Sequence, residues 1–175
     1  MRLTGKRVYL FVEDMYQEHE FWYPFFRLRE EGAQVVVVAP EKGREYKSKF
    51  GVPVVSAAAA HTVESKDCAG IVIPGGYAPD LMRRNEDMVR LVAKAFGQGK
   101  IVAAICHAPW MLASADILKG RRCTSFFSIR DDLIHAGADW ADEEVVVNGN
   151  LITARRPDDL PAFMRAVIGA VEEAV

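Results

Sequence analysis

The sequence predicts an α/β fold, in which a mostly parallel sheet carries helices on both of its faces. Two observations support this prediction: short, continuous apolar runs of strand length recur along the chain, and amphipathic segments separate them. Continuous apolar strands are typical of parallel sheets, because helices cover both faces and no side of the strand meets water. The chain has 175 residues, a length that fits a single domain over 1–175.

In the first half of the chain, residues 8–12 and 35–39 are the first two predicted strands. Aromatic and aliphatic side chains between them recur at helical spacing, and this predicts a helix that ends near Gly32, a typical C-cap residue. Residues 40–55 combine glycines with alternating apolar side chains, which indicates a small β excursion. Residues 70–74 are the third strand, which a Pro-Gly-Gly sequence stops.

In the second half, residues 86–98 place their apolar side chains on one helical face, and residues 100–105 are the fourth buried strand. Residues 145–153 contain two β runs around an Asn-Gly pair, which is a strong hairpin signal because both residues tolerate positive φ. We therefore expect an antiparallel strand at one edge of the sheet. The acidic pair at 158–159 opens the last amphipathic helix, where negative charge complements the helix dipole.

Charge and composition exclude several classes of protein. Lysine and arginine number 22 and aspartate and glutamate 24, a net charge of −2, which does not favour nucleic acid as a partner. No apolar stretch is long enough to span a membrane and no secretory signal is recognised, so we expect a cytoplasmic protein. The three cysteines form no C-x-x-C pair and no histidine shows metal-ligand spacing, so we expect neither metal nor cofactor. The basic run at 42–49 alternates with glutamates and indicates a solvated hairpin.

The densest chemical signal lies where the fourth strand ends at Cys106 and a helix predicted over 107–115 begins. A sharp turn from strand to helix, a nucleophile elbow, lifts one side chain above the sheet and needs small neighbours, here Ala104 and Ala108. The thiol would also lie at a helix N-terminus, which lowers a thiol pKa, and at the strand ends where ligands collect. We predict that Cys106 is a nucleophile; the alternative is an ordinary buried cysteine.

A second strand end carries Gly75 and Gly76, whose backbone N–H groups are approachable because glycine has no side chain. Together with the amide of His107, these N–H groups could form an oxyanion hole. The alternative is a tight turn with no role in chemistry.

Several motifs recur in a specific order along nearly the whole chain. They are Ile73-Pro-Gly-Gly-Tyr-Ala-Pro-Asp80, Ala104-Ile-Cys-His-Ala-Pro109, Leu118-Lys-Gly-Arg121, Thr124-Ser125, Ile129-Arg-Asp-Asp132 and Ala136-Gly-Ala-Asp-Trp140. In this order the chain resembles the ThiJ/PfpI intracellular protease family, within the class I glutamine amidotransferase-like superfamily. The resemblance implies one ThiJ/PfpI-like domain with a flavodoxin-like three-layer sandwich.

The resemblance also implies a set of site residues. Cys106 takes the position of the nucleophile, with His107 beside it and an acid, here Asp80, supplied by a neighbouring subunit. Such a site requires a homo-oligomer, a dimer or a hexamer, with each site completed across subunits. Glu20 takes the position of a largely protonated carboxyl that is hydrogen-bonded to the sulfur. Gln17 stands where the family often has glutamate, and it can form hydrogen bonds but cannot act as an acid or base.

Three functions are compatible with these residues. We expect the first, a stress-related cysteine hydrolase of the PfpI-like type in which Cys106 attacks an acyl or carbonyl carbon of a peptide or small molecule; the other two are alternatives. The second is a glyoxalase or deglycase that acts on methylglyoxal or on its protein adducts. The third is a redox-sensing stress protein without turnover, because an accessible thiol of low pKa suits sensing as well as catalysis. A true glutaminase fits poorly, because His135 is followed by Ala-Gly rather than by the His-x-Glu pattern of that class.

Overall fold

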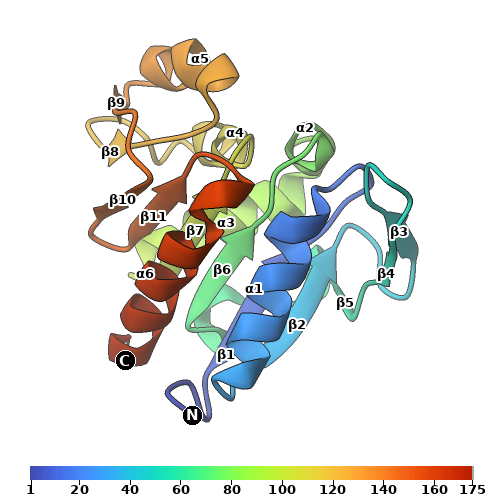
Figure 1. Ribbon diagram of the computed structural model, residues 1–175. Helices are drawn as coiled ribbons and strands as arrows, with labels where there is room; N and C mark the ends of the chain where they lie inside the picture. The colour runs from blue at the N-terminus through green and yellow to red at the C-terminus, as the bar shows by residue number, and fades with distance from the viewer. Residues whose placement is uncertain (175) are drawn as a thin grey trace.

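The computed structural model describes residues 1–174, which form one seven-stranded sheet in the order β10-β11-β7-β6-β1-β2-β5 (Figure 1). The strands are β1 (Arg7–Phe11), β2 (Gln34–Ala39), β5 (Ala58–Ala59), β6 (Gly70–Ile73), β7 (Ile101–Ile105), β10 (Val145–Asn148) and β11 (Leu151–Ala154). All neighbouring strands are parallel except β10 and β11, which pair antiparallel at one edge. The predicted α/β fold with a mostly parallel sheet and an antiparallel edge strand is confirmed.

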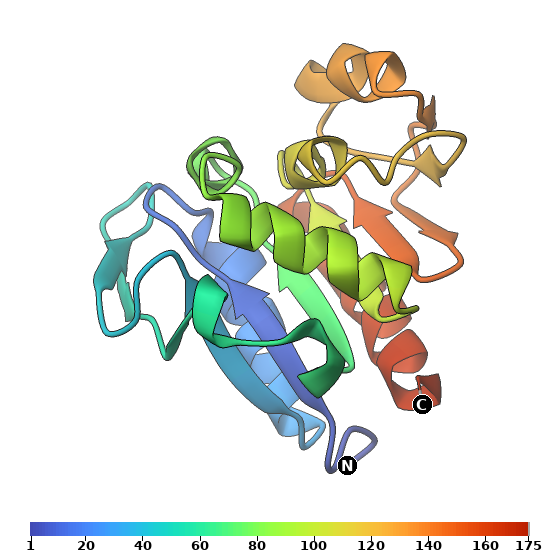
Figure 2. The same cartoon turned by 180° about the vertical axis from the view of Figure 1, so that it is seen from behind.

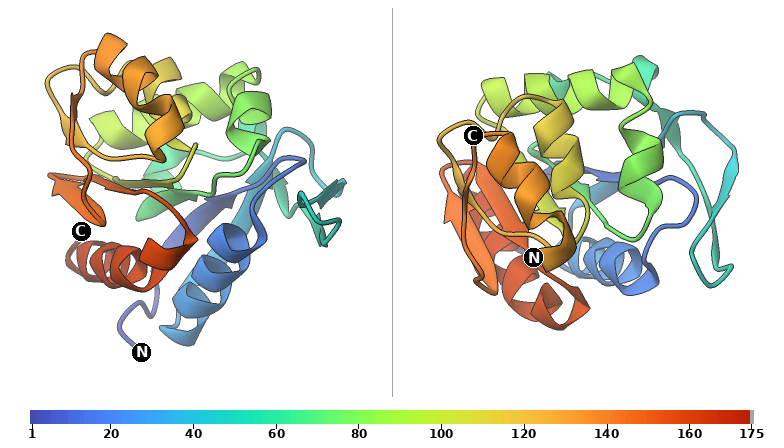
Figure 3. Two further views of the ribbon diagram at one scale, coloured as in Figure 1. Left: turned by 45° about the horizontal axis from the view of Figure 1, so that its top comes forward. Right: turned by 90° about the horizontal axis from the view of Figure 1, so that it is seen from above.

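Helices cover both faces of this sheet. The helices are α1 (Glu18–Glu30), α2 (Ala78–Met82), α3 (Glu86–Gly97), α4 (Pro109–Ser114), α5 (Arg130–His135) and α6 (Leu160–Glu173). Helices α1 and α6 lie side by side on one face, and α3 crosses the other (Figure 2). The short helices α2, α4 and α5 gather above the carboxyl ends of the strands (Figure 3). Strands β6 and β7 are buried along their whole length between these layers, which explains their unbroken apolar sequence.

Smaller elements complete the chain. They are the hairpin of β3 (Glu45–Lys47) and β4 (Pro53–Val55), the pair β8 (Arg122–Cys123) and β9 (Asp139–Trp140), and the single turns η1 (Ala60–Thr62), η2 (Ser65–Asp67), η3 (Phe127–Ile129) and η4 (Pro157–Asp159). The hairpin confirms the predicted β excursion over 40–55. Within residues 1–174, no helix combines the length and the apolar character that crossing a membrane requires.

Two differences from the sequence-based expectation have simple causes. The helix after the elbow was expected over 107–115 but begins only at Pro109, because the turn after Cys106 occupies two further residues. Helix α2 and the strands β5, β8 and β9 were not predicted. Each is too short to show a hydrophobic period, and only its tertiary neighbours stabilise it.

Candidate active site

The elbow places Cys106 directly after β7, above the carboxyl edge of the sheet. Its φ is +64°, a left-handed conformation that is uncommon for any residue except glycine. Hydrogen bonds on both sides hold this conformation: the Cys106 N–H donates to the carbonyl of Ala154 at 3.0 Å, and its own carbonyl accepts from the N–H of Phe126 at 2.9 Å. The side chain is 7% exposed. The backbone of the elbow is therefore held on both sides, and little of Cys106 is exposed to solvent.

The imidazole of His107 lies against this thiol. Its Nδ1 is 3.2 Å from Sγ of Cys106, and its Nε2 is 3.1 Å from Oγ of Ser128 on η3. The ring stacks on Phe126 with a centroid distance of 5.1 Å and meets the edge of Trp110 at 5.2 Å. Burial lowers the pKa of His107, so the ring is neutral at pH 7 and able to accept a proton.

A carboxyl group lies beneath the thiol. Glu20, in the first turn of α1, is completely buried, and its Oε2 accepts a hydrogen bond from the N–H of Gly75 at 2.7 Å. A Cβ atom at Gly75 would lie 2.6 Å from that oxygen and 2.7 Å from Cβ of Cys106, so only glycine fits there. Burial raises the pKa of Glu20 to about 7, although the Gly75 N–H and the Cys106 side chain act in the opposite direction. Glu20 can therefore gain or lose a proton near neutral pH.

Backbone amides surround the sulfur. Burial, and then the charge of Glu20, raise the pKa of the Cys106 thiol to about 12, although the N–H groups of Gly76 and His107 act in the opposite direction. The N–H of Gly75, expected as a third donor to an oxyanion, donates to Glu20 instead. The expected lowering of the thiol pKa is not found, because burial and the charge of Glu20 outweigh the amide donors. Gly76 has a φ of +79°, which glycine adopts freely. Amide N–H groups beside a thiol can donate to an oxyanion that forms on the carbon bonded to the sulfur.

The remaining residues predicted from the sequence lie apart from the sulfur. Gln17 caps α1: its Oε1 accepts from the N–H of Glu20 at 3.1 Å, and it also lines the cavity beside the thiol. Asp80, on α2, forms an ion pair with Arg84, and within residues 1–174 no hydrogen bond joins it to His107. In this chain, Ser128 takes the position next to Nε2 of His107.

A cavity of about 430 Å³ opens above the thiol. Its lining residues are Met15, Gln17, Glu20, Lys49, Gly76, Tyr77, Cys106, His107, Trp110, Phe126 and Pro157. No pattern in the sequence indicated Lys49 or Ser128 as site residues. Lys49 lies in a charged run that is typical of a solvated hairpin, and Ser128 lies in a segment whose apolar residues have neither helical nor strand spacing. Among the described residues, no three His, Cys, Asp or Glu side chains are grouped so that they could hold a metal ion.

This arrangement combines a thiol, a neutral imidazole, a carboxyl with a pKa near neutrality and two free amide donors around one small cavity. The thiol can attack an electrophilic carbon, the imidazole can take its proton and the amides can stabilise the resulting oxyanion. The carboxyl can move a second proton between neighbouring atoms of a bound ligand.

Comparison with known proteins identifies relatives along almost the whole chain. A family model described as the DJ-1/PfpI family matches residues 6–170. A deglycase of Pyrococcus abyssi is 43% identical over 162 residues, which cover 93% of this chain and 97% of the relative. The Bacillus subtilis protein YraA, named as a candidate cysteine protease, is 42% identical over 162 residues, which cover 92% of this chain and 95% of the relative.

A solved structure gives the same result. The two-domain protein of Anabaena variabilis, which contains DJ-1/ThiJ/PfpI-like and ferritin-like domains, matches with a TM-score of 0.93 and 41% identity. The match covers 94% of this chain and 49% of that one. Relatives named as deglycases confirm the prediction that the chain is an enzyme. The sequence resemblance, the fold and the matched residues agree: this chain belongs to the DJ-1/PfpI family.

Proposed function

We propose that the chain is a deglycase, which removes α-oxoaldehydes such as methylglyoxal from the sulfur or nitrogen atoms to which they have added. The observation that carries this proposal is the position of the Cys106 thiol, 3.2 Å from the imidazole of His107 and above a carboxyl with a pKa of about 7. The deglycase names of several relatives favour this activity, an alternative in the sequence analysis, over the cysteine hydrolase that we expected from the sequence. A cavity of about 430 Å³ also suits a small adduct.

In the first step, Sγ of Cys106 bonds to the former aldehyde carbon of the adduct and the bond from that carbon to the modified residue breaks. His107 takes the thiol proton through Nδ1 and passes it to the departing sulfur or nitrogen. The raised pKa of the thiol and the lowered pKa of the imidazole keep both groups neutral before substrate arrives. Proton transfer therefore accompanies the attack. The product is a hemithioacetal on Cys106.

In the second step, the carboxylate of Glu20 takes the proton from the carbon that carries the sulfur, which gives an enediol. Reprotonation at the neighbouring carbon converts the enediol into a lactate thioester, so that one carbon is oxidised and its neighbour reduced with no external oxidant. Water then hydrolyses the thioester to lactate and the free thiol. The N–H groups of Gly76 and His107 are the donors to the oxyanion of this last step.

A second copy of the chain would complete the site. Asp80 lies on α2 close to the cavity residue Tyr77, and within one chain it pairs with Arg84 instead of His107. Assembly that brings a partner's α2 toward His107 would place a carboxylate on the exposed side of the imidazole. Sedimentation of wild type measures its oligomeric state, and kcat/KM for wild type and Asp80→Asn measures the contribution of the Asp80 carboxylate to the reaction. A wild-type monomer with full activity would contradict a site completed by a second copy.

The test of the proposal is a panel of substrates. Wild type is expected to release lactate over many turnovers from the methylglyoxal adducts of N-acetylcysteine and N-acetylarginine, and to leave a fluorogenic peptide amide intact. Turnover of the peptide amide alone would indicate the peptidase. No turnover of any substrate, with rapid oxidation of Cys106 by peroxide, would indicate the redox sensor.

A further inference from the structure

The cavity wall contains one cationic side chain that the mechanism does not use. Lys49 lies in the turn between β3 and β4, where its N–H donates to the carbonyl of Tyr16 at 3.0 Å. Tyr16 is completely buried, forms β-bridges with Ser48 and Gly76, and donates its hydroxyl hydrogen to the carbonyl of Val52 at 2.8 Å. The backbone that carries Lys49 is therefore attached to the segment that borders the oxyanion donors.

Lys49 differs from two other basic residues of the same run, Arg44 and Lys47. Arg44 forms ion pairs with two carboxylates and Lys47 with one. Within residues 1–174, no carboxylate oxygen lies within 4.0 Å of Nζ of Lys49, which instead lies 5.2 Å from the centroid of the Phe50 ring. A lysine at the wall of a cavity without an acidic partner leaves its charge available to a ligand.

The charge of Lys49 acts on the reacting groups. It lowers the pKa of Glu20 and the pKa of His107, so both groups lie within its field. His107 is neutral at pH 7, and Lys49 is then the sole permanent cation among the lining residues. Much of the remaining wall is apolar, with Met15, Trp110 and Phe126, and gives a ligand carboxylate no other charged partner.

We propose that Lys49 binds a carboxylate of the substrate, so that the enzyme prefers adducts of free amino acids and other small carboxylate-bearing thiols and amines. This inference rests on the proposed deglycase function and specifies its substrate class. An adduct within a polypeptide has no carboxylate next to the modified residue, because the carboxyl group is part of a peptide bond. Such adducts lose the interaction with Lys49.

Two matched substrates test the inference: the methylglyoxal hemithioacetals of N-acetylcysteine, which carries a carboxylate, and of N-acetylcysteine amide, which does not. We expect wild type to show a kcat/KM for lactate release roughly fivefold higher with the acid, a ratio typical of one partly exposed charge pair. Lys49→Met is expected to reduce the ratio to about one, and Lys49→Glu to invert it. The control is Lys47→Met on the same hairpin, whose side chain is 65% exposed and does not line the cavity.

Equal rates for acid and amide in wild type, or a preference that survives Lys49→Met, would overturn the inference. If wild type turns over neither adduct, the deglycase proposal fails while this inference can still be decided by binding. In that case calorimetry compares N-acetylcysteine with its amide on Cys106→Ala and on Cys106→Ala/Lys49→Met. Tighter binding of the acid that disappears with Lys49 supports the carboxylate site, and equal binding contradicts it.

Discussion

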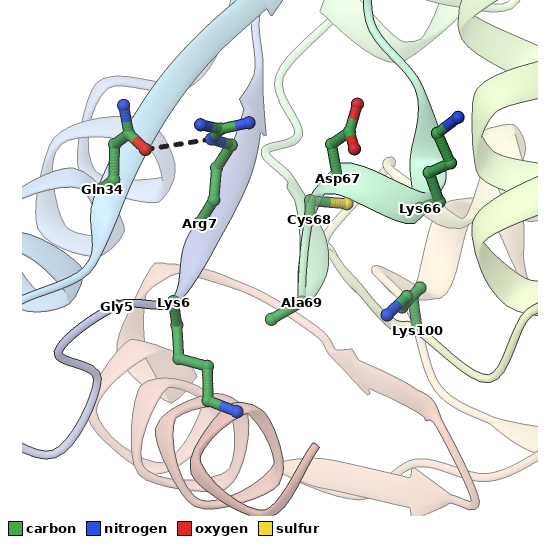
Figure 4. A pocket seen from close by; sticks show the side chains of 9 residues that line it. All are labelled: Gly5, Lys6, Arg7, Gln34, Lys66, Asp67, Cys68, Ala69 and Lys100. Atoms are coloured by element: carbon green, nitrogen blue, oxygen red, sulfur yellow. Dashed lines mark hydrogen bonds between the residues drawn. The ribbon is translucent and has the colours of Figure 1, made fainter. Parts of the chain in front are cut away.

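The two edges of the sheet each hold a cavity with a buried cysteine, but of these two cysteines only the one at the carboxyl edge has both an imidazole and a carboxyl among the lining residues of its cavity. At the carboxyl edge, Cys106 faces an imidazole, a carboxyl and two amide donors. At the amino edge, Cys68 lines a cavity of about 320 Å³ (Figure 4). Its thiol donates to the carbonyl of Ser65 at 3.3 Å. Burial raises both thiol pKa values to about 12. Burial and pKa alone therefore do not distinguish a reactive thiol from an inert one.

The difference lies in the neighbours of each thiol. The amino-edge cavity is lined by Lys6, Arg7, Lys66 and Lys100 with Asp67, a set without an imidazole to accept a proton. Its basic side chains suit the end of the molecule where helices terminate: Lys6 donates to the carbonyl of Ala174, directly after α6. Parallel strands and right-handed crossovers place helix C-termini at this edge and turns such as the elbow at the other.

The largest expected effect comes from removing each thiol in turn. Cys106→Ala should lower lactate release by at least about a thousandfold, because the covalent step is lost. Cys68→Ala should stay within about twofold of wild type, because its sulfur contacts no reacting group. The measurement is kcat/KM with the N-acetylcysteine adduct of methylglyoxal. Comparable losses in both variants would show that the amino-edge thiol takes part in the reaction.

A methyl group at either edge gives the next largest effect. Gly75→Ala places Cβ 2.6 Å from the carboxyl of Glu20 and should reduce kcat by about a hundredfold, because misplacing reacting groups by about 1 Å is costly. Gly97→Ala, at the end of α3 near the amino edge, meets no atom within 4 Å and is the matched control. It should leave kcat unchanged and stabilise the fold by up to about 1 kcal/mol. Normal activity in folded Gly75→Ala would contradict the close packing of the site.

The buried carboxyl should make stability depend on pH. Glu20 ionises near its ordinary pKa of 4.5 when unfolded and near 7 when folded, so its protonated form favours folding. The stabilisation of the folded state by protonated Glu20 is fully present below about pH 4.5 and is lost as the pH rises through 7. At 1.36 kcal/mol per pKa unit, the free energy of unfolding changes by about 3 kcal/mol over this range. Glu20→Gln removes the titrating group. We expect the free energy of unfolding in urea to fall for wild type relative to Glu20→Gln between pH 4.5 and pH 8. If the two proteins show the same dependence on pH, the pKa of the Glu20 carboxyl is not raised in the folded state.

The smallest effect comes from the serines near the two thiols. Ser128→Ala removes the hydroxyl 3.1 Å from Nε2 of His107 and should lower kcat about threefold, with a shifted pH profile because the imidazole loses its orientation. Ser65→Ala removes a hydrogen bond to the side chain of Gln98 near Cys68. It should cost about 1 kcal/mol of stability and leave the pH profile of kcat unchanged. A shifted pH profile of kcat in Ser65→Ala would show that the amino edge of the sheet affects the reacting groups at the carboxyl edge.

Local sequence signals were sufficient for the elements with a clear pattern. The apolar runs predicted the buried strands, the Asn-Gly pair predicted the β10–β11 hairpin, and the small residues around Cys106 predicted the elbow. Such signals act within a few residues, where sterics and burial dictate the conformation. The pKa of the thiol was not predicted correctly, because it depends on how deeply the sulfur is buried and on the position of Glu20.

The sequence by itself determined the longer strands and helices, the turn at Cys106 and the glycines that allow close approach, because each depends on the residue preferences of a short stretch. Only the tertiary structure placed Glu20 against Gly75, 55 residues away, and Ser128 next to His107. It also brought Lys49 from an exposed hairpin to the cavity wall. These neighbours are set by the strand order and by the helices that return across the sheet, and no short stretch of the chain encodes that geometry.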